Sequence, residues 1–237
     1  MTAQCDCLVP ILEGVGNHAP NCAVFRPPPH KAKHTTARGR RTITPPQPDI
    51  IPARFFARIN AIDLSLTSTG LATYHRQQDT DPIVRSITYT VKVPNTATIE
   101  AREHRIRYMV DNVELYLGTA DLIIIEGASH GSVGGHAWDR AGAWWQIVRT
   151  AIACGCPVVQ VAPTIRAKWA TGNGKSDKAA VAAAMTRRLP TISFNNSDEA
   201  DAAALGYMAA QQLGWLPGTK AELDALRSVN WPKGVHA

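Results

Sequence analysis

The sequence predicts an α/β fold, in which a mixed sheet is flanked by helices and preceded by an N-terminal extension. Two observations predict it: three strand-like segments follow one another from residue 59, and helical and strand patterns then alternate toward the end of the chain. Successive strands indicate an antiparallel start to the sheet. The 237 residues, 45% of them hydrophobic, suffice for one sizeable core and an appendage.

Five strands are expected. The first three cover residues 59–66, 70–75 and 84–93; the first is an apolar run interrupted by one aspartate, and the third alternates as a half-exposed strand does. Residues 121–126, with the sequence DLIIIE, form the short, continuously apolar run of a strand buried on both faces, as in a parallel sheet. The fifth strand is expected at residues 157–162.

Helical spacing of apolar residues predicts an amphipathic helix over residues 98–117. Four more helices are expected, at residues 137–153, 176–189, 198–213 and 219–228. Because these helices alternate with the later strands, they are expected to cover the sheet.

Composition divides the chain into four segments. Residues 26–53 combine proline with Arg, Lys and Thr and contain few aromatic residues, which is typical of an extended tether. Residues 1–25 before it form a candidate zinc-binding segment, residues 54–216 a folded catalytic domain, and residues 217–237 a helical tail. No apolar run approaches the roughly 20 residues needed to cross a bilayer, and no signal peptide is recognised, so we expect a cytoplasmic location.

The positive charge is concentrated before the folded domain. Between Arg26 and Arg58 there are eight basic residues and one acid, so the rest of a chain with formal charge +6 is close to neutral. Such a segment indicates a polyanion partner, because lysine and arginine displace the counterions condensed on phosphates. Arg38, Arg40 and Arg41 are the candidate DNA contacts. The alternative is a solvated linker that only keeps the protein in solution.

Soft metal ligands gather near the N-terminus. They form a C-x-C-x10-H-x3-C arrangement of Cys5, Cys7, His18 and Cys22. These four side chains could complete a tetrahedral zinc site, although the first spacing is shorter than usual. Free cysteines in a tail are the alternative, and an odd total of five cysteines argues against a disulfide framework.

Two carboxylates interrupt apolar strands. Asp63 lies within the first strand, and Glu126 ends the strand DLIIIE, where ligands gather in open α/β sheets. A buried charge costs several kcal/mol unless it is paired. Each side chain could instead be a structural carboxylate that accepts hydrogen bonds from backbone amides.

Two further acids open a helix near residue 198. Ser197 is the expected N-cap, and Asp198 and Asp201, three residues apart, share one helix face while Glu199 points away. Because Leu205 continues that face, the two aspartates are expected to point inward. Acids at a helix N-terminus can also be there only for the helix dipole.

Four convergent carboxylates require cations. Each pair at about 4 Å repels by roughly 4 kcal/mol at an effective dielectric of about 20. Oxygen ligands favour Mg²⁺ or Mn²⁺ over zinc, and two such ions can stabilise both the attacking water and the leaving oxygen of a phosphodiester. The residues therefore predict metal-dependent hydrolysis of nucleic acid.

Four motifs occur in the order and spacing of a known family: AIDLSLTSTGLA at residues 61–72, LIIIEG at 122–127, TGNGKSDKAAV at 171–181 and SDEADAAALG at 197–206. Over residues 59–214 the chain resembles the RuvC-type Holliday junction resolvases, members of the ribonuclease H-like superfamily. Four separated motifs are more specific than any single one, especially the D-x-x-D that opens the last core helix.

The resemblance implies a ribonuclease H-like five-stranded mixed sheet, a homodimer, and paired magnesium-dependent nicks across a four-way DNA junction in recombination and repair. It implies a catalytic, metal-binding set of Asp63, Glu126, Asp198 and Asp201. It also implies that Lys178 contacts the scissile phosphate or stabilises its developing charge, with Lys175 close by.

The chain departs from the family after Glu126. The family has junction-probing residues there that include an aromatic, whereas this chain has Gly127, Ala128, Ser129 and His130. The N-terminal extension also has no counterpart in the compact family. We therefore expect that forks, flaps or other branched DNA could be substrates as well.

Three other functions share features with parts of this sequence. Gly174-Lys175-Ser176 resembles the end of a P-loop, but Trp169 stands where that motif requires a glycine. Residues 63–70 are similar to the first phosphate loop of sugar kinases and their actin-like relatives, but no second such loop is found. A catalytically inactive DNA-binding scaffold is the non-enzymatic alternative, and the presence of all four acids argues against it.

Several other residues are secondary candidates: His104, His130, His136, Trp144, Trp145, Trp169, Cys154 and Cys156. The histidines could orient water or DNA, or be ordinary surface residues. The tryptophans could stack on bases, but the first two are more typical of packing or a dimer interface. The cysteines are expected at a helix end without a catalytic role.

Overall fold

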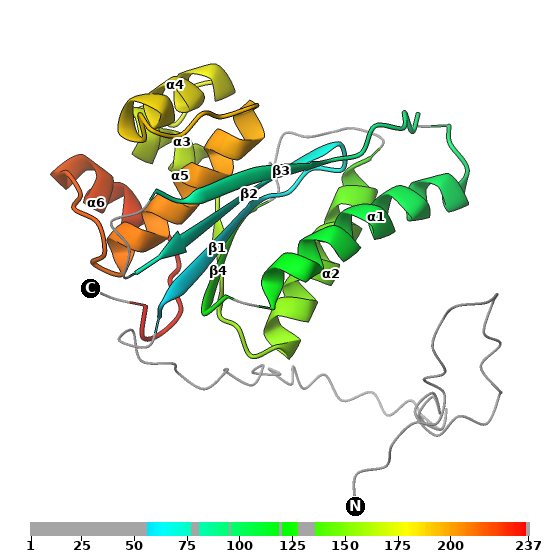
Figure 1. Ribbon diagram of the computed structural model, residues 1–237, viewed down its shortest axis with the longest axis horizontal. Coiled ribbons are helices and arrows are strands. Elements are labelled where there is room, and N and C mark those ends of the chain that lie inside the picture. The colour runs from blue at the N-terminus through cyan, green and yellow to red at the C-terminus, as the bar shows by residue number, and fades with distance from the viewer. Residues whose placement is uncertain (1–55, 77–80, 95, 119, 128–135, 236–237) are drawn as a thin grey trace, which may run out of the picture. The chain divides into compact units, whose positions relative to one another are not determined.

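Five strands form one mixed sheet in the order β3-β2-β1-β4-β5 (Figure 1). The computed structural model describes residues 56–76, 81–94, 96–118, 120–127 and 136–235. The strands are β1 Arg58–Asp63, β2 Ser68–His75, β3 Ile83–Thr88, β4 Leu122–Glu126 and β5 Val158–Val161. Strands β1, β2 and β3 are antiparallel neighbours, whereas β1, β4 and β5 are parallel. The predicted five-stranded mixed sheet flanked by helices is confirmed.

Six helices are found within the described ranges: α1 Ile99–Leu117, α2 Ala137–Ala153, α3 Pro163–Thr171, α4 Lys178–Arg188, α5 Ser197–Gln212 and α6 Lys220–Leu226. Five of them match expected helices, whereas α3 was not predicted. Pro163 begins α3 and Gly172 ends it with a φ of 80°, an arrangement that fits proline at the first helical position and glycine after the last. None of these helices is long and apolar enough to cross a membrane.

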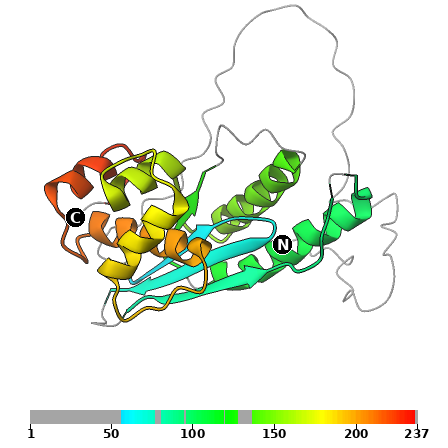
Figure 2. The same cartoon turned by 90° about the horizontal axis from the view of Figure 1, so that it is seen from above.

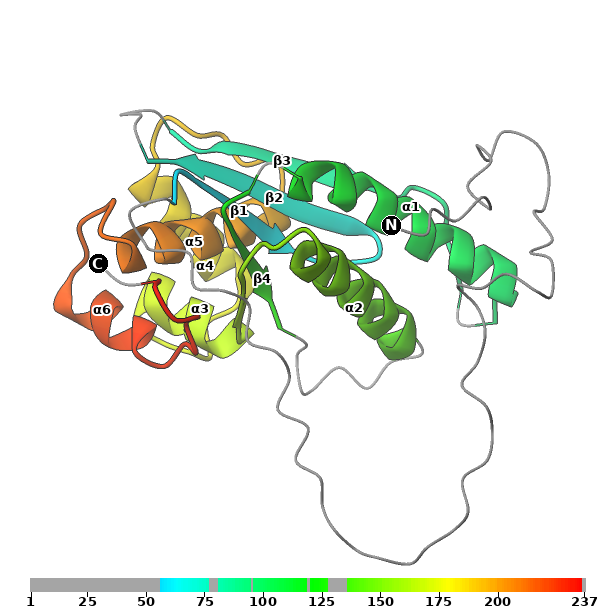
Figure 3. The ribbon, with the colours of Figure 1, turned by 90° about the horizontal axis from the view of Figure 1, so that it is seen from below.

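The sheet is covered on both faces. Helices α1 and α2 pack on one face, and α5 packs on the other, with α3, α4 and α6 around it (Figures 2 and 3). Strand β4 shows the division, because Leu122 and Ile124 belong to the core on the α5 side while Ile123 and Ile125 belong to the core under α1 and α2. This alternation explains why the run DLIIIE is apolar at successive positions.

Helix α5 lies close to the sheet because its buried face is built from small residues. Seven residues of this kind are buried in it: Ala200, Ala202, Ala203, Ala204, Gly206, Ala209 and Ala210. A Cβ added at Gly206 would lie 2.3 Å from the ring of Tyr74, whose hydroxyl donates a hydrogen bond to the Ala203 carbonyl at 2.7 Å. The approach of α5 matters for the site, since this helix begins beside the ends of β1 and β2.

Three local predictions were wrong. Strand β1 ends at Asp63 rather than at residue 66, so Asp63 is its last residue. Strand β3 ends at Thr88 rather than at residue 93, because Thr88 pairs with Ser68, the first residue of β2, and no partner strand continues beyond it. The N-cap of α5 is Asn196 rather than Ser197, since the Asn196 side chain accepts a hydrogen bond from the Glu199 amide. The end of β3 depends on pairing with β2, a strand 20 residues earlier at this point. The cap of α5 differs from the expected residue by one position.

We expect Gly70→Ala to destabilise the fold by about 1 to 3 kcal/mol, the usual cost of overpacking. Gly70 pairs with Asp63, and a Cβ there would lie 1.9 Å from the Asp198 carbonyl oxygen, so the start of α5 would have to move. Urea unfolding followed by circular dichroism measures the change.

Gly142→Ala is the matched control for Gly70→Ala. Apart from the adjacent residues and backbone of α2 itself, no described atom lies within 4 Å of a Cβ added at this position. Alanine also favours the helix by roughly 1 kcal/mol over glycine. Equal free energies of unfolding for Gly70→Ala and the wild type would contradict the close approach of α5 to β2.

Candidate active site

Asp63 and Glu126 lie at the carboxyl ends of two adjacent parallel strands. The register pairs Ile62 with Ile125, so the next residue of each strand falls beside the other. Strand alternation places Asp63 on the face of Ile59 and Ala61, which is the face toward α5. Asp63 is only 4% exposed. The sheet therefore directs both carboxylates to one point at its edge.

Helix α5 supplies two more carboxylates from its first turn. Asp198 and Asp201 are one turn apart, and Asp201 has no exposed surface. Glu199 points away, as expected, and its carboxylate accepts hydrogen bonds from the Asn195 amide and the Ser86 hydroxyl at 2.7 and 3.0 Å. The Asn196 cap fixes where this turn starts, and hence which acids point toward the sheet.

The structure brings three of the four acids into one tight group. One carboxylate oxygen from each of Asp63, Asp198 and Asp201 lies within 4.8 Å of the others. Glu126 lies against Asp63 and is joined to Asp201 through an arginine. These carboxylates come from β1, β4 and α5, so only the tertiary fold could place them together.

Lys178 contacts all three aspartates from the first position of α4. Its Nζ lies 2.7 Å from Asp198 Oδ1, 3.6 Å from Asp63 Oδ2 and 3.5 Å from Asp201 Oδ2. Asp177 caps α4 and thereby sets the position of this lysine. The Lys178 side chain is 54% exposed, so it lies at the open edge of the cluster.

Lys175 takes a different place. It lies in the loop between α3 and α4, where its backbone N–H donates a hydrogen bond to Asn173 Oδ1 at 3.0 Å. Among the described residues, the ion pairs of the four acids involve Arg166 and Lys178 but not Lys175. Lys175 is therefore near the site in sequence without contacting its carboxylates.

Arg166 of α3 enters the cluster from the buried side and was not predicted. Its Nη1 lies 2.7 Å from Asp201 Oδ2, its Nη2 lies 3.2 Å from Glu126 Oε1, and the residue is only 4% exposed. The proline and glycine that bracket α3 could have revealed the helix, but an arginine in a short helix reads as a surface residue. Its burial is a property of the fold alone.

Burial among like charges changes the proton affinity of the acids. Desolvation, the charge of Asp63 and a hydrogen bond with Asp63 raise the pKa of Glu126 to about 9. Desolvation also raises the pKa of Asp201 to about 6, although Arg166 opposes the shift. Burial disfavours the Lys178 ammonium, but Asp63, Asp198 and Asp201 together hold its pKa above the ordinary value. These shifts mark a site where negative charge exceeds positive charge.

The donor set fits a hard divalent cation. Four buried carboxylate oxygens have no hydrogen-bond partner among the described residues: Asp63 Oδ2, Glu126 Oε1, Asp201 Oδ1 and Asp201 Oδ2. Three of them lie within 4.0 Å of a lysine or arginine nitrogen, but without hydrogen-bond geometry. Buried acceptors normally have a donor or an ion. Oxygen-only ligands match Mg²⁺ or Mn²⁺ better than zinc.

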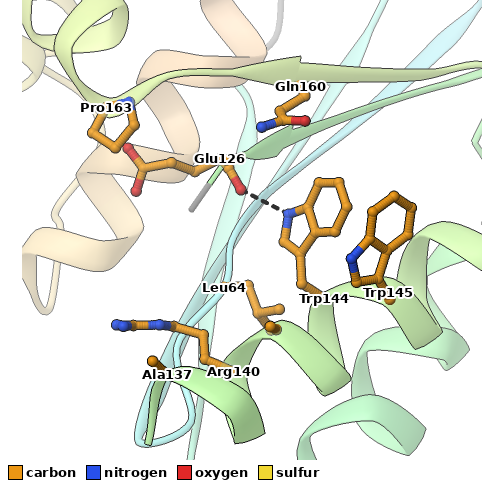
Figure 4. A pocket seen from close by; sticks show the side chains of 10 residues that line it. Leu64, Glu126, Ala137, Arg140, Trp144, Trp145, Gln160 and Pro163 are labelled. Carbon is orange, nitrogen blue, oxygen red and sulfur yellow. Dashed lines mark hydrogen bonds between the residues drawn. The ribbon is translucent and has the colours of Figure 1, made fainter. Parts of the chain in front are cut away.

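An aromatic groove of about 400 Å³ adjoins Glu126 (Figure 4). Trp144 and Trp145 of α2 line one side, and Gln160 of β5 and Pro163 lie across from them. The Trp144 indole N–H donates a hydrogen bond to the Glu126 carbonyl at 2.9 Å, so the tryptophan helps to fix the end of β4. The two indole rings pack edge to face, and Trp145 remains largely exposed.

The remaining secondary candidates that the structure describes do not line this groove. His136 contacts Arg105 and Asp139, His104 contacts Tyr89, and Trp169 is buried with its indole N–H on Gln211. Stacking of Trp169 on bases is therefore wrong, because the ring has no exposed face. Cys154 caps the end of α2 and Cys156 is buried, as expected of cysteines at a helix end. His130 and the N-terminal candidates Cys5, Cys7, His18, Cys22, Arg38, Arg40 and Arg41 lie outside the described residues.

A five-stranded mixed sheet in the order β3-β2-β1-β4-β5 with helices on both faces is the ribonuclease H-like fold. Within that class the chain has the fold of the RuvC-type Holliday junction resolvases. Similar structures include Thermus thermophilus RuvC, with a TM-score of 0.50 and 18% identity over 68% of this chain and 99% of that one. Another is T. thermophilus RuvC in complex with a Holliday junction substrate, with a TM-score of 0.53 and 19% identity over 69% of this chain and 99% of that one.

A third structure, the yeast mitochondrial Holliday junction resolvase Ydc2, has a TM-score of 0.40 and 14% identity over 75% of this chain and 82% of that one. Comparison of the sequence itself finds neither a matching family model nor a matching curated protein. The likeness is therefore one of fold.

We expect the protein in EDTA to lose stability as the pH rises from about 5 to about 9. The unfolded chain releases the proton of a glutamate near its ordinary pKa, whereas the folded chain keeps the Glu126 proton until about pH 9, so the unfolded state binds fewer protons in this window. Glu126→Gln should reduce this decrease in stability with pH. Melting temperatures measured at a series of pH values test it.

Glu103→Gln is the matched control, because Glu103 is an exposed glutamate of α1 that pairs only with Arg107 among the described residues. It should keep the wild-type pH dependence. A wild-type slope in the Glu126→Gln variant would show that the Glu126 carboxyl is not the group that retains its proton.

Proposed function

We propose that this protein is a metal-dependent DNA endonuclease that hydrolyses phosphodiesters at four-way junctions and related branched DNA. The observation that carries the proposal is the convergence of Asp63, Asp198 and Asp201, whose carboxylate oxygens lie within 4.8 Å of one another beside Glu126. The fold supports branched DNA as the substrate, since one structure of the same fold is RuvC in complex with a Holliday junction substrate.

The proposed roles follow from position. Asp63, Asp198 and Asp201 would hold Mg²⁺ or Mn²⁺, with Glu126 completing a set for two ions. Bound there, such ions supply Lewis-acid stabilisation of phosphate charge and lower the pKa of water. Lys178, exposed at the edge of the cluster, would contact the scissile phosphate and stabilise the charge that develops on it. Lys175 would contact the DNA backbone nearby.

A homodimer is part of the proposal, because a four-way junction needs two nicks. Helix α2 supports it with three large apolar residues that are exposed at intervals of seven: Trp138, Trp145 and Ile152. Residues seven apart lie on one helix face. A second copy of the chain could cover this face, and linearisation of a cruciform plasmid in one binding event would report paired cutting.

One observation favours a second candidate function, a scaffold that binds branched DNA without cutting it. Arg166 and Lys178 already place two positive charges among the four acids, so part of the repulsion is relieved without an ion. Labelled four-way junction, fork, flap and duplex, each incubated in Mg²⁺ and in EDTA, separate the two. Binding without cutting favours the scaffold, and cutting of plain duplex alone indicates a nuclease of other specificity.

We expect Asp63→Asn, Asp198→Asn and Asp201→Asn each to reduce cleavage of branched DNA by at least about 100-fold, the scale seen when one group that stabilises transition-state charge is removed. Binding of the same DNA should persist, because the phosphate contacts are made by basic residues. Single-turnover cleavage and gel-shift assays measure the two effects.

Asp224→Asn is the control for these variants, since Asp224 lies on α6 and pairs with Arg227 on the surface. It should cleave like the wild type. Wild-type cleavage by any of the three site variants would remove that residue from the catalytic set.

The N-terminal segment is proposed to be a DNA-binding attachment. Deleting residues 1–53 should weaken binding and flatten its dependence on salt, because Arg38, Arg40, Arg41 and the other basic residues of that segment no longer release counterions. Cleavage should remain measurable at low salt, since the catalytic residues lie later in the chain. An unchanged slope of affinity against salt would show that this segment does not contact DNA.

Zinc binding by Cys5, Cys7, His18 and Cys22 remains part of this proposal. Zinc content of the wild type should approach one ion per chain and fall in a Cys5→Ser, Cys7→Ser variant. Equal, near-zero content in both proteins would reject the zinc site.

A further inference from the structure

We propose that Arg166 is a positioning residue that acts as an internal counter-cation for the carboxylate cluster and makes divalent ions bind in order, first at the aspartates and then at Glu126. The inference rests on the proposed function, since it concerns the ions of that site. Its basis is the bridge from one guanidinium to Asp201 and Glu126, at 2.7 and 3.2 Å.

The fold holds this guanidinium in place. Helix α3 follows directly after β5, and the Arg166 amide closes its first turn on the Ala162 carbonyl. One turn further along α3, the Trp169 indole donates a hydrogen bond to Gln211 of α5 at 2.8 Å. An anchored helix that presents a planar, permanently charged group reaches two carboxylates at once, as a flexible lysine would not.

The two cations of the cluster differ in mobility. Lys178 is 54% exposed on a flexible stem and contacts the three aspartates, whereas Arg166 is buried and contacts Glu126 and Asp201. An ion that enters among the aspartates can bind Asp201 Oδ1, which pairs with no described lysine or arginine, so Arg166 can stay on Oδ2 and only the Lys178 ammonium must swing toward solvent. An ion that uses Glu126 must also draw this carboxyl away from the buried Arg166 guanidinium, and a buried charge that loses its partner is costly.

Ordered binding follows from this asymmetry. The first ion should bind the three aspartates, whose oxygens already lie within 4.8 Å of one another. The second should bind more weakly, because it competes with the Arg166 guanidinium for Glu126. Arg166 would thus stabilise the protein before ions bind and set the ion concentration at which both sites fill.

A purely structural role for Arg166 gives a different expectation. In that case removal of the guanidinium lowers stability but leaves the affinity of the second ion unchanged. Arg188 serves as the matched structural arginine: it stacks on Trp169 and Tyr207 and pairs with Glu222, away from the four acids.

The test is Mn²⁺ binding to the full-length chain without DNA, followed by calorimetry and by electron paramagnetic resonance of free Mn²⁺. Wild type should show one tighter and one weaker site. Arg166→Met should tighten the weaker site at least about tenfold, a change of about 1.4 kcal/mol. Arg166→Met should also lower the melting temperature in EDTA. Adding Mn²⁺ should then raise the melting temperature of this variant by more than it raises that of the wild type.

The second-site Mn²⁺ affinity of Arg166→Lys should lie between those of the wild type and Arg166→Met, because lysine keeps the charge without the two-pronged contact. This variant decides the question if Arg166→Met does not fold. Arg188→Met should lower the melting temperature and leave both Mn²⁺ affinities at wild-type values. Unchanged second-site affinity in the Arg166 variants overturns this inference alone. Failure of the wild type to bind any Mn²⁺ contradicts the proposed function itself.

Discussion

Burial of like charges is the constraint on which the rest of this structure depends. Asp63 and Asp201 are buried with Glu126 half-buried beside them, and the three charges would repel one another strongly at low dielectric. Two features of the fold reduce this repulsion. The pKa values of Glu126 and Asp201 are raised, and Arg166 contacts both of these acids while Lys178 contacts Asp201. The compensation is incomplete, because buried carboxylate oxygens remain without a hydrogen-bond donor among the described residues.

The surrounding architecture serves this cluster. Parallel pairing of β1 with β4 aligns two acids at one edge, and the small residues of α5 let the helix lie close enough to add two more. Gly70 is the tightest point, since the α5 backbone passes where its Cβ would be. Such a cluster lowers the stability of the fold wherever its carboxylates repel one another without a cation to balance them.

Helix α3 and the groove beside Glu126 show how neighbouring elements complete the site. Arg166 reaches the acids from below the surface, and the Trp144 indole fixes the carbonyl of Glu126 from the opposite helix layer. Glu126 is thus contacted at its side chain by α3 and at its backbone carbonyl by α2. Such support holds the Glu126 carboxyl in position beside the exposed Lys178.

The sequence by itself determined the α/β class, the five strands, five of the six described helices and the four acids, because period-2 and period-3.6 patterns and charges inside apolar runs are local signals. Only the tertiary structure decided that Arg166 is buried between Glu126 and Asp201, that β3 stops at Thr88, and that Trp169 is enclosed. Those outcomes depend on partners 20 or more residues away in the chain, and pairing across such separations leaves no periodicity in the sequence.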